Sequence, residues 1–276
     1  MTHWPDNKRF AVTLSFDLDA ESAWEPSSLG GRRLSLLSMG AYGRRVGVPR
    51  LLELLARYGV RAQFYIPARV AEIDPQVVRN IAAAGHGIGC HGYFHERVDE
   101  QTPEQNLQIL KDAKALLEAL INRPVTHYRA PLWELTPDVV ESLIALGFHS
   151  DSSLMGDDRP YRVGSAGKGL LELPVSWLLD DWEQFAYSVE PAVGSVIEDP
   201  EKVFRLWSAE LEGMRRYGSH FILTMHPQLI GRASRIAMLE RLIQQIQGYD
   251  DAWICTPDDV YSHWQAGGLA MPLHPY

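Results

Sequence analysis

Short apolar runs alternate along this sequence with longer segments whose apolar residues recur at helical spacing. The short runs are expected to be strands, and prolines or capping residues open the segments between them. Strands are expected at residues 10–16, 61–66, 86–90, 125–129, 170–173, 220–225 and 252–255. Helices are expected at residues 49–58, 75–84, 102–120, 136–147, 199–217, 234–247 and 256–264. Alternation of this kind predicts parallel strands with helices outside them, in a barrel or a doubly wound sheet.

The chain shows no internal repeat, low-complexity tract or linker that would divide it. We therefore expect residues 1–276 to form a single α/β domain. A segment containing several glycines and serines, residues 20–47, follows the first strand and is expected to be an insertion near the mouth of the site. The second half is less regular, and residues 156–169 and 180–199 are expected to be mostly loop.

Charge and cysteine content exclude several classes of protein. The net charge of −9 argues against nucleic acid as a partner, because such proteins normally present a basic face. Cys90 and Cys255 lie far apart and form no CxxC pair, so both are expected to be buried thiols in a reducing compartment. The polar start of the chain and the short apolar run after it predict neither a secretory signal nor a membrane span. The sequence thus predicts a cytoplasmic protein without a membrane partner.

Two carboxylates end the first expected strand. Asp17 and Asp19 share one face of that strand, because side chains alternate, while Phe16 and Leu18 point the other way. Burying two like charges is costly unless a cation or a shared proton compensates. The alternative is a pair of solvated carboxylates in a turn.

Two histidines follow the third expected strand. His91 and His95 are close enough in sequence to meet one metal ion, and Gly92 lets the loop wrap around it. Two imidazoles and a carboxylate leave positions open for water and substrate, as catalytic zinc sites do. In a barrel, functional residues gather at the carboxyl ends of strands, where both motifs lie. Taken alone, the histidine spacing could be accidental.

Two more strand ends carry chemistry-bearing residues. Arg129 is expected to pair with a site carboxylate, Pro131 fixes the turn after it, and Trp133 supplies an apolar wall. His226 follows the strand at residues 220–225 and precedes a proline. The alternatives are a surface arginine and a core histidine. The remaining histidines are interpreted as structural: His3, His86, His127, His149, His220, His263 and His274.

These segments, in this order, resemble the polysaccharide deacetylase family, whose catalytic unit is the NodB homology domain. The matching motifs are Phe16-Asp17, His91-x-x-x-His95, Arg129-x-Pro131, Asp180-Asp181-Trp182 and His226. The resemblance extends from about residue 9 to residue 264. It implies a distorted (β/α) barrel with fewer strands than the eight-stranded type.

Leu18 separates the two aspartates, which are adjacent in the common family pattern. The separated form resembles a branch that holds a peptidoglycan-deacetylase-like enzyme together with allantoin and cyclic-imide hydrolases. Further matches to this branch are His91–His95, Ala130–Glu134, Ser152–Met155, Trp177–Asp181 and His226–Arg232.

The resemblance implies a role for each site residue. Asp19, His91 and His95 would hold a divalent metal ion, with zinc the expected one. Asp17 would be the general base with Arg129 behind it, and His226 would protonate the departing nitrogen. Expected contacts with the substrate come from Trp24, Pro131, Trp133, Asp181 and Arg232.

The sequence leaves the substrate open between an N-acetylated amino sugar and a small linear or cyclic amide. The missing export signal favours the small amide, and so does the segment at residues 20–47 if it acts as a lid. That segment could instead be a subunit contact or a mobile loop. Aromatic residues in expected loops, together with the branch resemblance, predict a homo-oligomer. An inactive, metal-free binding module is the alternative of another class; it would lack ligand residues, and none is missing.

Overall fold

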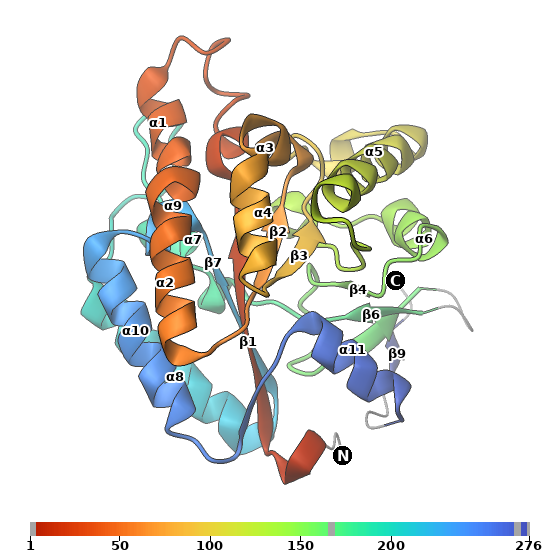
Figure 1. Cartoon of the computed structure of the whole chain (residues 1–276), viewed down its shortest axis with the longest axis vertical. Helices are drawn as coiled ribbons and strands as arrows, with labels where there is room; N and C mark the ends of the chain where they lie inside the picture. Colours follow the sequence, from red (N-terminus) through yellow and green to blue (C-terminus); the bar gives the residue numbers. More distant parts are fainter. Residues whose placement is uncertain (1–3, 165–168, 268–271, 275–276) are drawn as a thin grey trace.

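A five-stranded parallel sheet forms the centre of the fold (Figure 1). The structure, a computed structural model, describes residues 4–164, 169–267 and 272–274. The sheet consists of β1 (Phe10–Asp17), β2 (Gln63–Ile66), β3 (Gly87–Cys90), β7 (His220–Met225) and β8 (Ala252–Ile254). All its pairings are parallel, so the carboxyl ends of the strands meet at one edge.

Strand β1 occupies the middle of this sheet. One of its edges pairs with β7 along residues 11–16. The other edge is shared, with β8 beside residues 10–12 and β2 beside residues 15–17. Every residue of β1 is buried, which explains why the strand is a continuous apolar run with few polar positions.

A second, smaller sheet continues the curve. It consists of β4 (Ser150–Asp151), β5 (Tyr161–Val163), β6 (Leu170–Glu172) and β9 (Leu273–His274). Single bridges join the two sheets, from Cys90 to Tyr128 and from His127 to Ser150, and another links Asp180 to Thr224 of β7. The strands therefore follow the course of a barrel without a continuous ladder around it, which agrees with the predicted distorted barrel.

The expected strand at residues 125–129 was wrong. The backbone of Tyr128 donates to Ser150, whereas that of Arg129 donates to Cys90. Tyr128 and Arg129 thus donate backbone hydrogen bonds to segments on opposite sides. Because each side is bonded at a single position, no continuous ladder of hydrogen bonds forms.

Helices cover the outside of the sheets (Figure 1). They are α1 (Leu34–Tyr42), α2 (Val48–Tyr58), α3 (Ala68–Ile73), α4 (Pro75–Ala83), α5 (Pro103–Ile121), α6 (Pro137–Ala145), α7 (Trp182–Phe185), α8 (Pro200–Tyr217), α9 (Pro227–Ile230), α10 (Ala233–Gln247) and α11 (Pro257–Gln265). Helix α2 illustrates why they form, because Leu51, Leu54 and Leu55 recur at helical spacing and are all buried. It ends at Gly59, whose φ of 62° suits glycine. Helix α5 begins with the expected capping box of Thr102 and Gln105.

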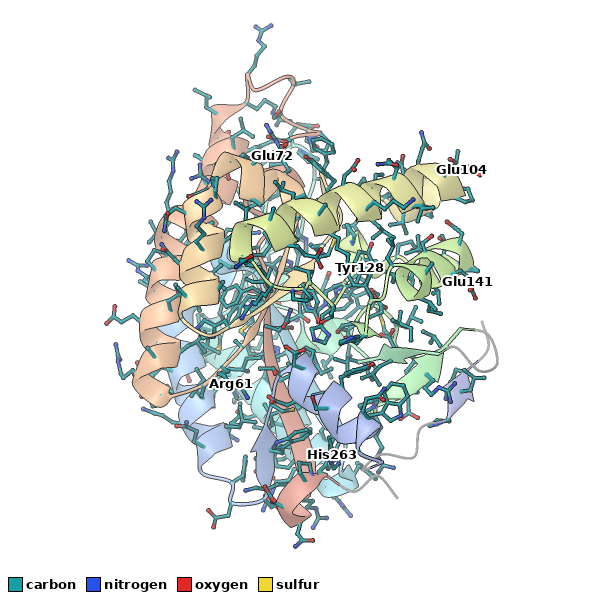
Figure 2. All side chains as sticks on the ribbon, turned by 45° about the vertical axis from the view of Figure 1, so that its right-hand side comes forward. Arg61, Glu72, Glu104, Tyr128, Glu141 and His263 are labelled. Carbon is teal, nitrogen blue, oxygen red and sulfur yellow. The ribbon has the colours of Figure 1, made fainter. Side chains whose placement is uncertain are left out.

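Side chains divide between this helical exterior and the interior as their chemistry requires. Glu104 and Glu141 project outward from α5 and α6, whereas Tyr128 lies buried between the elements (Figure 2). Cys90 and Cys255 are both free and buried, as predicted. Within the described residues, no helix combines the length and apolar character needed to cross a bilayer.

Most of the segment at residues 20–47 is helical rather than loop. A 3-10 turn (Ala20–Ala23) follows β1, and α1 continues through a π turn (Gly43–Gly47) into α2. Other elements not expected are α3, α7, α9, β4, β5 and β9. The sequence of α1 shows little helical periodicity of apolar residues, because only Leu36, Gly40 and Ala41 are buried on this helix. His3 and residues 165–168 of an expected loop lie outside the described residues.

Gly47→Ala is expected to destabilise the fold by about 1–3 kcal/mol, the usual cost of overpacking. A Cβ at position 47 would lie 2.1 Å from the carbonyl oxygen of Pro227, so the π turn and α9 would have to separate. Gly213→Ala on α8 is the matched control, because a Cβ there meets no atom within 4 Å. The control should gain stability through helix propensity, by about 0.8–1.0 kcal/mol. Urea unfolding of both variants measures the contrast, and equal effects would contradict the close contact.

Candidate active site

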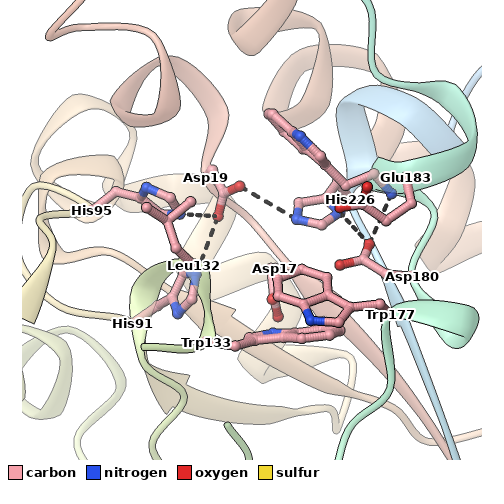
Figure 3. Close-up of a pocket in the computed structure, with 11 residues that line it drawn as sticks. Asp17, Asp19, His91, His95, Leu132, Trp133, Trp177, Asp180, Glu183 and His226 are labelled. Atoms are coloured by element: carbon pink, nitrogen blue, oxygen red, sulfur yellow. Dashed lines mark hydrogen bonds and ion pairs between the residues drawn. The ribbon is translucent and has the colours of Figure 1, made fainter. Parts of the chain in front are cut away.

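A pocket opens where β1, β3 and β7 end, and most of the predicted site residues line it (Figure 3). Its empty volume is about 510 Å³, part of which is open to solvent. The lining residues are Asp17, Asp19, His91, His95, Leu132, Trp133, Trp177, Asp180, Trp182, Glu183 and His226. Four acidic residues and three histidines thus share one pocket with three tryptophans.

One carboxylate oxygen faces two imidazoles in this pocket. Oδ1 of Asp19 lies 3.5 Å from Nε2 of His91 and 3.7 Å from Nε2 of His95. This oxygen is buried, and no described residue offers it a hydrogen bond. Nδ1 of His91 lies 2.7 Å from the carbonyl oxygen of Arg129 and must donate to it, so Nε2 presents its lone pair to Asp19. One carboxylate oxygen and two imidazole nitrogens therefore converge, and the lone pair of His91 is directed at the point where they meet.

The pKa values of Asp19, His91 and His95 indicate that this cluster lacks a positive charge. Burial raises the pKa of Asp19 to about 8, although the nearby His226 opposes that shift. Burial lowers the pKa of His91 to about 4 and that of His95 well below its usual value. With such a pKa Asp19 keeps its proton at neutral pH, because neither neutral imidazole supplies a countercharge; a cation between these groups would supply that charge in place of the proton. The donor set, one oxygen and two nitrogens, fits a divalent ion such as zinc.

Asp17 is held by a fully buried arginine. Nη1 of Arg129 donates to Oδ1 of Asp17 at 2.8 Å and to Oγ of Ser15 at 3.0 Å. Its Nε and Nη2 donate to the carbonyl and hydroxyl of Ser152, at 2.9 and 2.8 Å. The guanidinium carbon also lies 4.3 Å from the ring centroid of Tyr65. The predicted pairing of Arg129 with a site carboxylate is therefore present, and the surface alternative does not hold.

His226 is oriented by a second carboxylate. Oδ1 of Asp181 lies 2.7 Å from Nδ1 of His226 and also accepts its backbone N–H at 2.8 Å. Nε2 is consequently directed at the site, 3.5 Å from Oδ2 of Asp19. Burial lowers the pKa of His226, but the carboxylates of Asp180, Asp181 and Asp19 outweigh burial and leave the pKa well above its usual value. His226 can therefore carry a proton at neutral pH and present it to the pocket.

Tryptophans form the rim of the pocket. The rings of Trp133 and Trp177 lie 4.3 Å apart between centroids, and Trp182 stands edge-on to His226 at 5.1 Å. Leu132 and Trp133 have φ values of 58° and 56°, which residues with side chains rarely adopt. This strained turn places both residues at the mouth.

Four residues expected to contact substrate do not line this pocket. Pro131 packs beside Gly92, and Asp181 lies behind His226. Trp24 and Arg232 line a second pocket instead. Their contact with substrate stays a prediction.

Several lining residues were not singled out as site residues from the sequence. Trp177 lies in a 3-10 turn and Leu132 at the strained turn, where no periodic pattern marks them. Glu183 also carried no signal. Leu132, Trp177, Asp180 and Trp182 did belong to quoted motifs, but only their neighbours Pro131, Trp133 and Asp181 were selected as site residues.

The segment at residues 20–47 supports one wall of the site. Trp24 stacks on Trp182, with ring centroids 5.7 Å apart. Arg44 binds Glu21 at 2.7 Å and Asp74 at 3.1 Å, which ties the segment to the start of α4. No described residue of this stretch lines the first pocket, although Asp19 immediately before it does. Both predicted roles, a lid and a subunit contact, therefore stay predictions.

Comparison with known proteins relates this geometry to characterised folds. The polysaccharide deacetylase family model matches residues 40–150. A solved structure from Mycobacterium smegmatis, assigned to the polysaccharide deacetylases, is 38% identical, with a TM-score of 0.93 over 97% of this chain and 94% of that one. The peptidoglycan deacetylase of Helicobacter pylori (strain ATCC 700392 / 26695) is 28% identical over 90% of this chain and 94% of its own. An allantoinase structure shares the fold at 23% identity, with a TM-score of 0.84 over 96% and 93% of the two chains. These similarities confirm the predicted fold class.

Proposed function

Because this chain belongs to the polysaccharide deacetylase family, we propose that it is a metal-dependent hydrolase that removes an N-acetyl group from an amino sugar. The observation that carries the proposal is the unpartnered Oδ1 of Asp19, facing two imidazole nitrogens beside a candidate base and a candidate acid. The hydrolase class follows from the family. The metal, the residue roles and the substrate are the proposed part.

Asp19, His91 and His95 would hold the metal ion, and zinc is the ion that this donor set favours. When bound, such an ion acts as a Lewis acid toward a carbonyl oxygen and lowers the pKa of water. The protein holds His91 in place through the carbonyl oxygen of Arg129, which fixes the ring and its tautomer.

Asp17 would accept the proton of the attacking water. Arg129 binds its Oδ1, so the carboxylate keeps one orientation and the other oxygen can take the proton. The buried guanidinium also places a positive charge directly beside this carboxylate.

His226 would donate a proton to the departing nitrogen. Its Nδ1 is bound to Asp181, so Nε2 is the atom that can deliver the proton into the pocket. The surrounding carboxylates keep it protonated, as described above. An amine leaves far more readily when protonated, and this step completes cleavage of the C–N bond.

Asp181→Asn is expected to lower kcat roughly 10–100-fold, the usual effect of losing a partner that orients a catalytic group. The amide cannot stabilise a protonated His226 as the carboxylate does, so proton donation by His226 weakens. Asp258→Asn is the matched control, because Asp258 binds His127 at 2.7 Å but lies outside the pocket. Steady-state kinetics should show normal turnover for the control. Full activity of Asp181→Asn would remove the orienting role.

The pocket rim bears on the substrate. Trp133, Trp177 and Leu132 give it an apolar wall above a polar floor. Such a wall can stack on the face of a sugar ring. A relative named as a peptidoglycan deacetylase favours a glycan substrate. The same wall suits a planar cyclic imide or ureide, so a ring-opening amide hydrolase is the second candidate.

Substrate assays distinguish the two candidate functions. Chitotetraose should release acetate, whereas hydantoin and succinimide should stay closed, and Asp17→Asn should abolish the release. Ring opening without acetate release would select the second candidate. Binding of chitotetraose with no turnover of any of the three compounds would indicate a binding module and overturn the proposed enzyme.

A further inference from the structure

A second pocket lies behind the stacked rings of Trp24 and Trp182. Its empty volume is about 570 Å³, part of which is open to solvent. The lining residues are Trp24, Met39, Phe185, Ala186, Tyr187, Ile197, Gln228, Leu229, Arg232 and Arg235. Helices α1, α7, α9 and α10, which supply or adjoin these residues, lie together in Figure 1.

The two pockets share walls. Trp182 lines the first pocket, and residues 185–187 of the same stretch line the second. His226 lines the first, and Gln228 and Leu229, two and three residues later, line the second. The second pocket is thus separate from the candidate active site but built on the same two segments.

The second pocket carries positive charge without an ion-paired carboxylate. Arg232 donates to the carbonyl of Gln228 at 3.3 Å, and its guanidinium carbon lies 3.6 Å from the ring centroid of Tyr42. Arg235 donates to the carbonyl of Leu229 at 3.1 Å, and its guanidinium carbon lies over Phe185. Neither arginine has a carboxylate within ion-pair distance among the described residues, although the charge of Asp181 acts on Arg235; no acidic side chain is among the residues that line this pocket. A guanidinium that stacks on a ring and donates one N–H to a carbonyl has further N–H groups that can bind an anion.

Two buried polar side chains add a second, independent observation. Gln228 is 3% exposed, and neither its Oε1 nor its Nε2 has a hydrogen-bond partner among the described residues. Trp24 is likewise 3% exposed with an unpartnered Nε1. Buried polar atoms are nearly always paired, so two unpaired groups in the wall of one pocket indicate that this wall can rearrange to meet a hydrogen-bonding ligand.

We infer that this second pocket binds a small organic carboxylate with an apolar body. Arg232 and Arg235 supply the charge that receives the carboxylate, and Gln228 and Trp24 can add hydrogen bonds when their side chains turn toward the ligand. The apolar part of the ligand packs on Phe185, which is 2% exposed, and on the neighbouring aliphatic side chains. The site needs no metal and goes beyond the proposed hydrolysis.

Benzoate and its uncharged analogue benzamide test this inference on the intact protein. Isothermal titration calorimetry should show saturable benzoate binding, with benzamide at least about tenfold weaker because it lacks the charge. Tryptophan emission should change with the same saturation, since Trp24 lines the pocket. Arg232→Gln and Arg235→Gln should each weaken benzoate roughly tenfold or more.

Matched variants distinguish binding in the second pocket from binding elsewhere on the protein. Arg241 lies on α10, the helix that carries Arg235, and its guanidinium pairs with Glu201. Arg241→Gln should therefore leave benzoate binding unchanged. Asp19→Asn removes a candidate metal ligand, so unchanged binding there excludes benzoate capture in the first pocket. Thermal melting checks that each variant is folded, and Arg235→Lys, which keeps the charge, should retain more affinity than Arg235→Gln.

Three results would overturn the inference. They are equal binding of benzoate and benzamide, full benzoate affinity in a folded Arg232→Gln/Arg235→Gln double variant, and loss of binding in Asp19→Asn alone. Since the readout is binding, failure of this site is distinguishable from failure of the proposed hydrolysis.

Discussion

Asp17→Asn is expected to lower kcat by about 10²–10⁴-fold, the usual contribution of a positioned general base. Asparagine has the same shape, and its carbonyl oxygen can still accept the hydrogen bond that Arg129 donates to Asp17 at 2.8 Å. What it cannot do is take a proton from water. Turnover should therefore collapse, which steady-state kinetics would show. Because the change also removes one charge of a buried pair, a circular dichroism spectrum must show that the variant is folded.

The control for Asp17→Asn is another aspartate that pairs with an arginine away from the pocket. Asp74 binds Arg44 at 3.1 Å and caps α4. Asp74→Asn should leave kcat near the wild-type value. If Asp17→Asn kept near-full activity on a true substrate, Asp17 would not be the base.

Arg129→Met is expected to lower the free energy of unfolding by about 3–5 kcal/mol, the usual cost of removing one partner from a buried ion pair. The change leaves Asp17, which is 2% exposed, without its countercharge, and it strips Ser152 of two hydrogen-bond donors. Methionine fills part of the space, so the loss reports mainly the charge. Urea unfolding at constant pH measures it.

A double-mutant cycle isolates the pair. Asp17→Asn/Arg129→Met removes both charges, so it should recover part of the stability that Arg129→Met alone loses. Arg57→Gln breaks an exposed pair with Glu240 and should change stability little. An Arg129→Met protein as stable as the wild type would show that the buried pair contributes nothing net.

Much of the fold could be predicted because its signals are local. The runs that became β1 and β7 are buried on every residue, and each matches its expected strand to within one residue. Strand ends then located Asp17, His91 and His226, since parallel strands bring their carboxyl ends together. The alternation of side chains along a strand predicted the position of Asp19 less well. Asp19 lies just past β1, at the start of a 3-10 turn, yet it still lines the pocket.

The rest depended on contacts between distant segments. Helix α1 is set by the approach of Gly40 to the carbonyl of Ala20, a contact that no periodic pattern reveals. Trp177 reaches the pocket only because it packs on Trp133. Arg232 belongs to a matched motif and Trp24 to the predicted lid. In the fold, both residues line a second pocket behind the first.

A homo-oligomer also stays a prediction. Large apolar side chains are exposed on the segments around the site, among them Leu34 at 73% and Val189 at 76%. Such residues are the ones that a second copy of the chain would cover. A solution mass from light scattering measures the state directly.

Metal content tests the central claim most directly. Protein purified without added metal should carry about one equivalent of a divalent ion, zinc being the expected one, as measured by inductively coupled plasma mass spectrometry. Asp19→Asn and His95→Ala should lose the ion and the hydrolase activity together, and Asp74→Asn should keep both. A metal-free wild-type protein with intact activity would contradict the account.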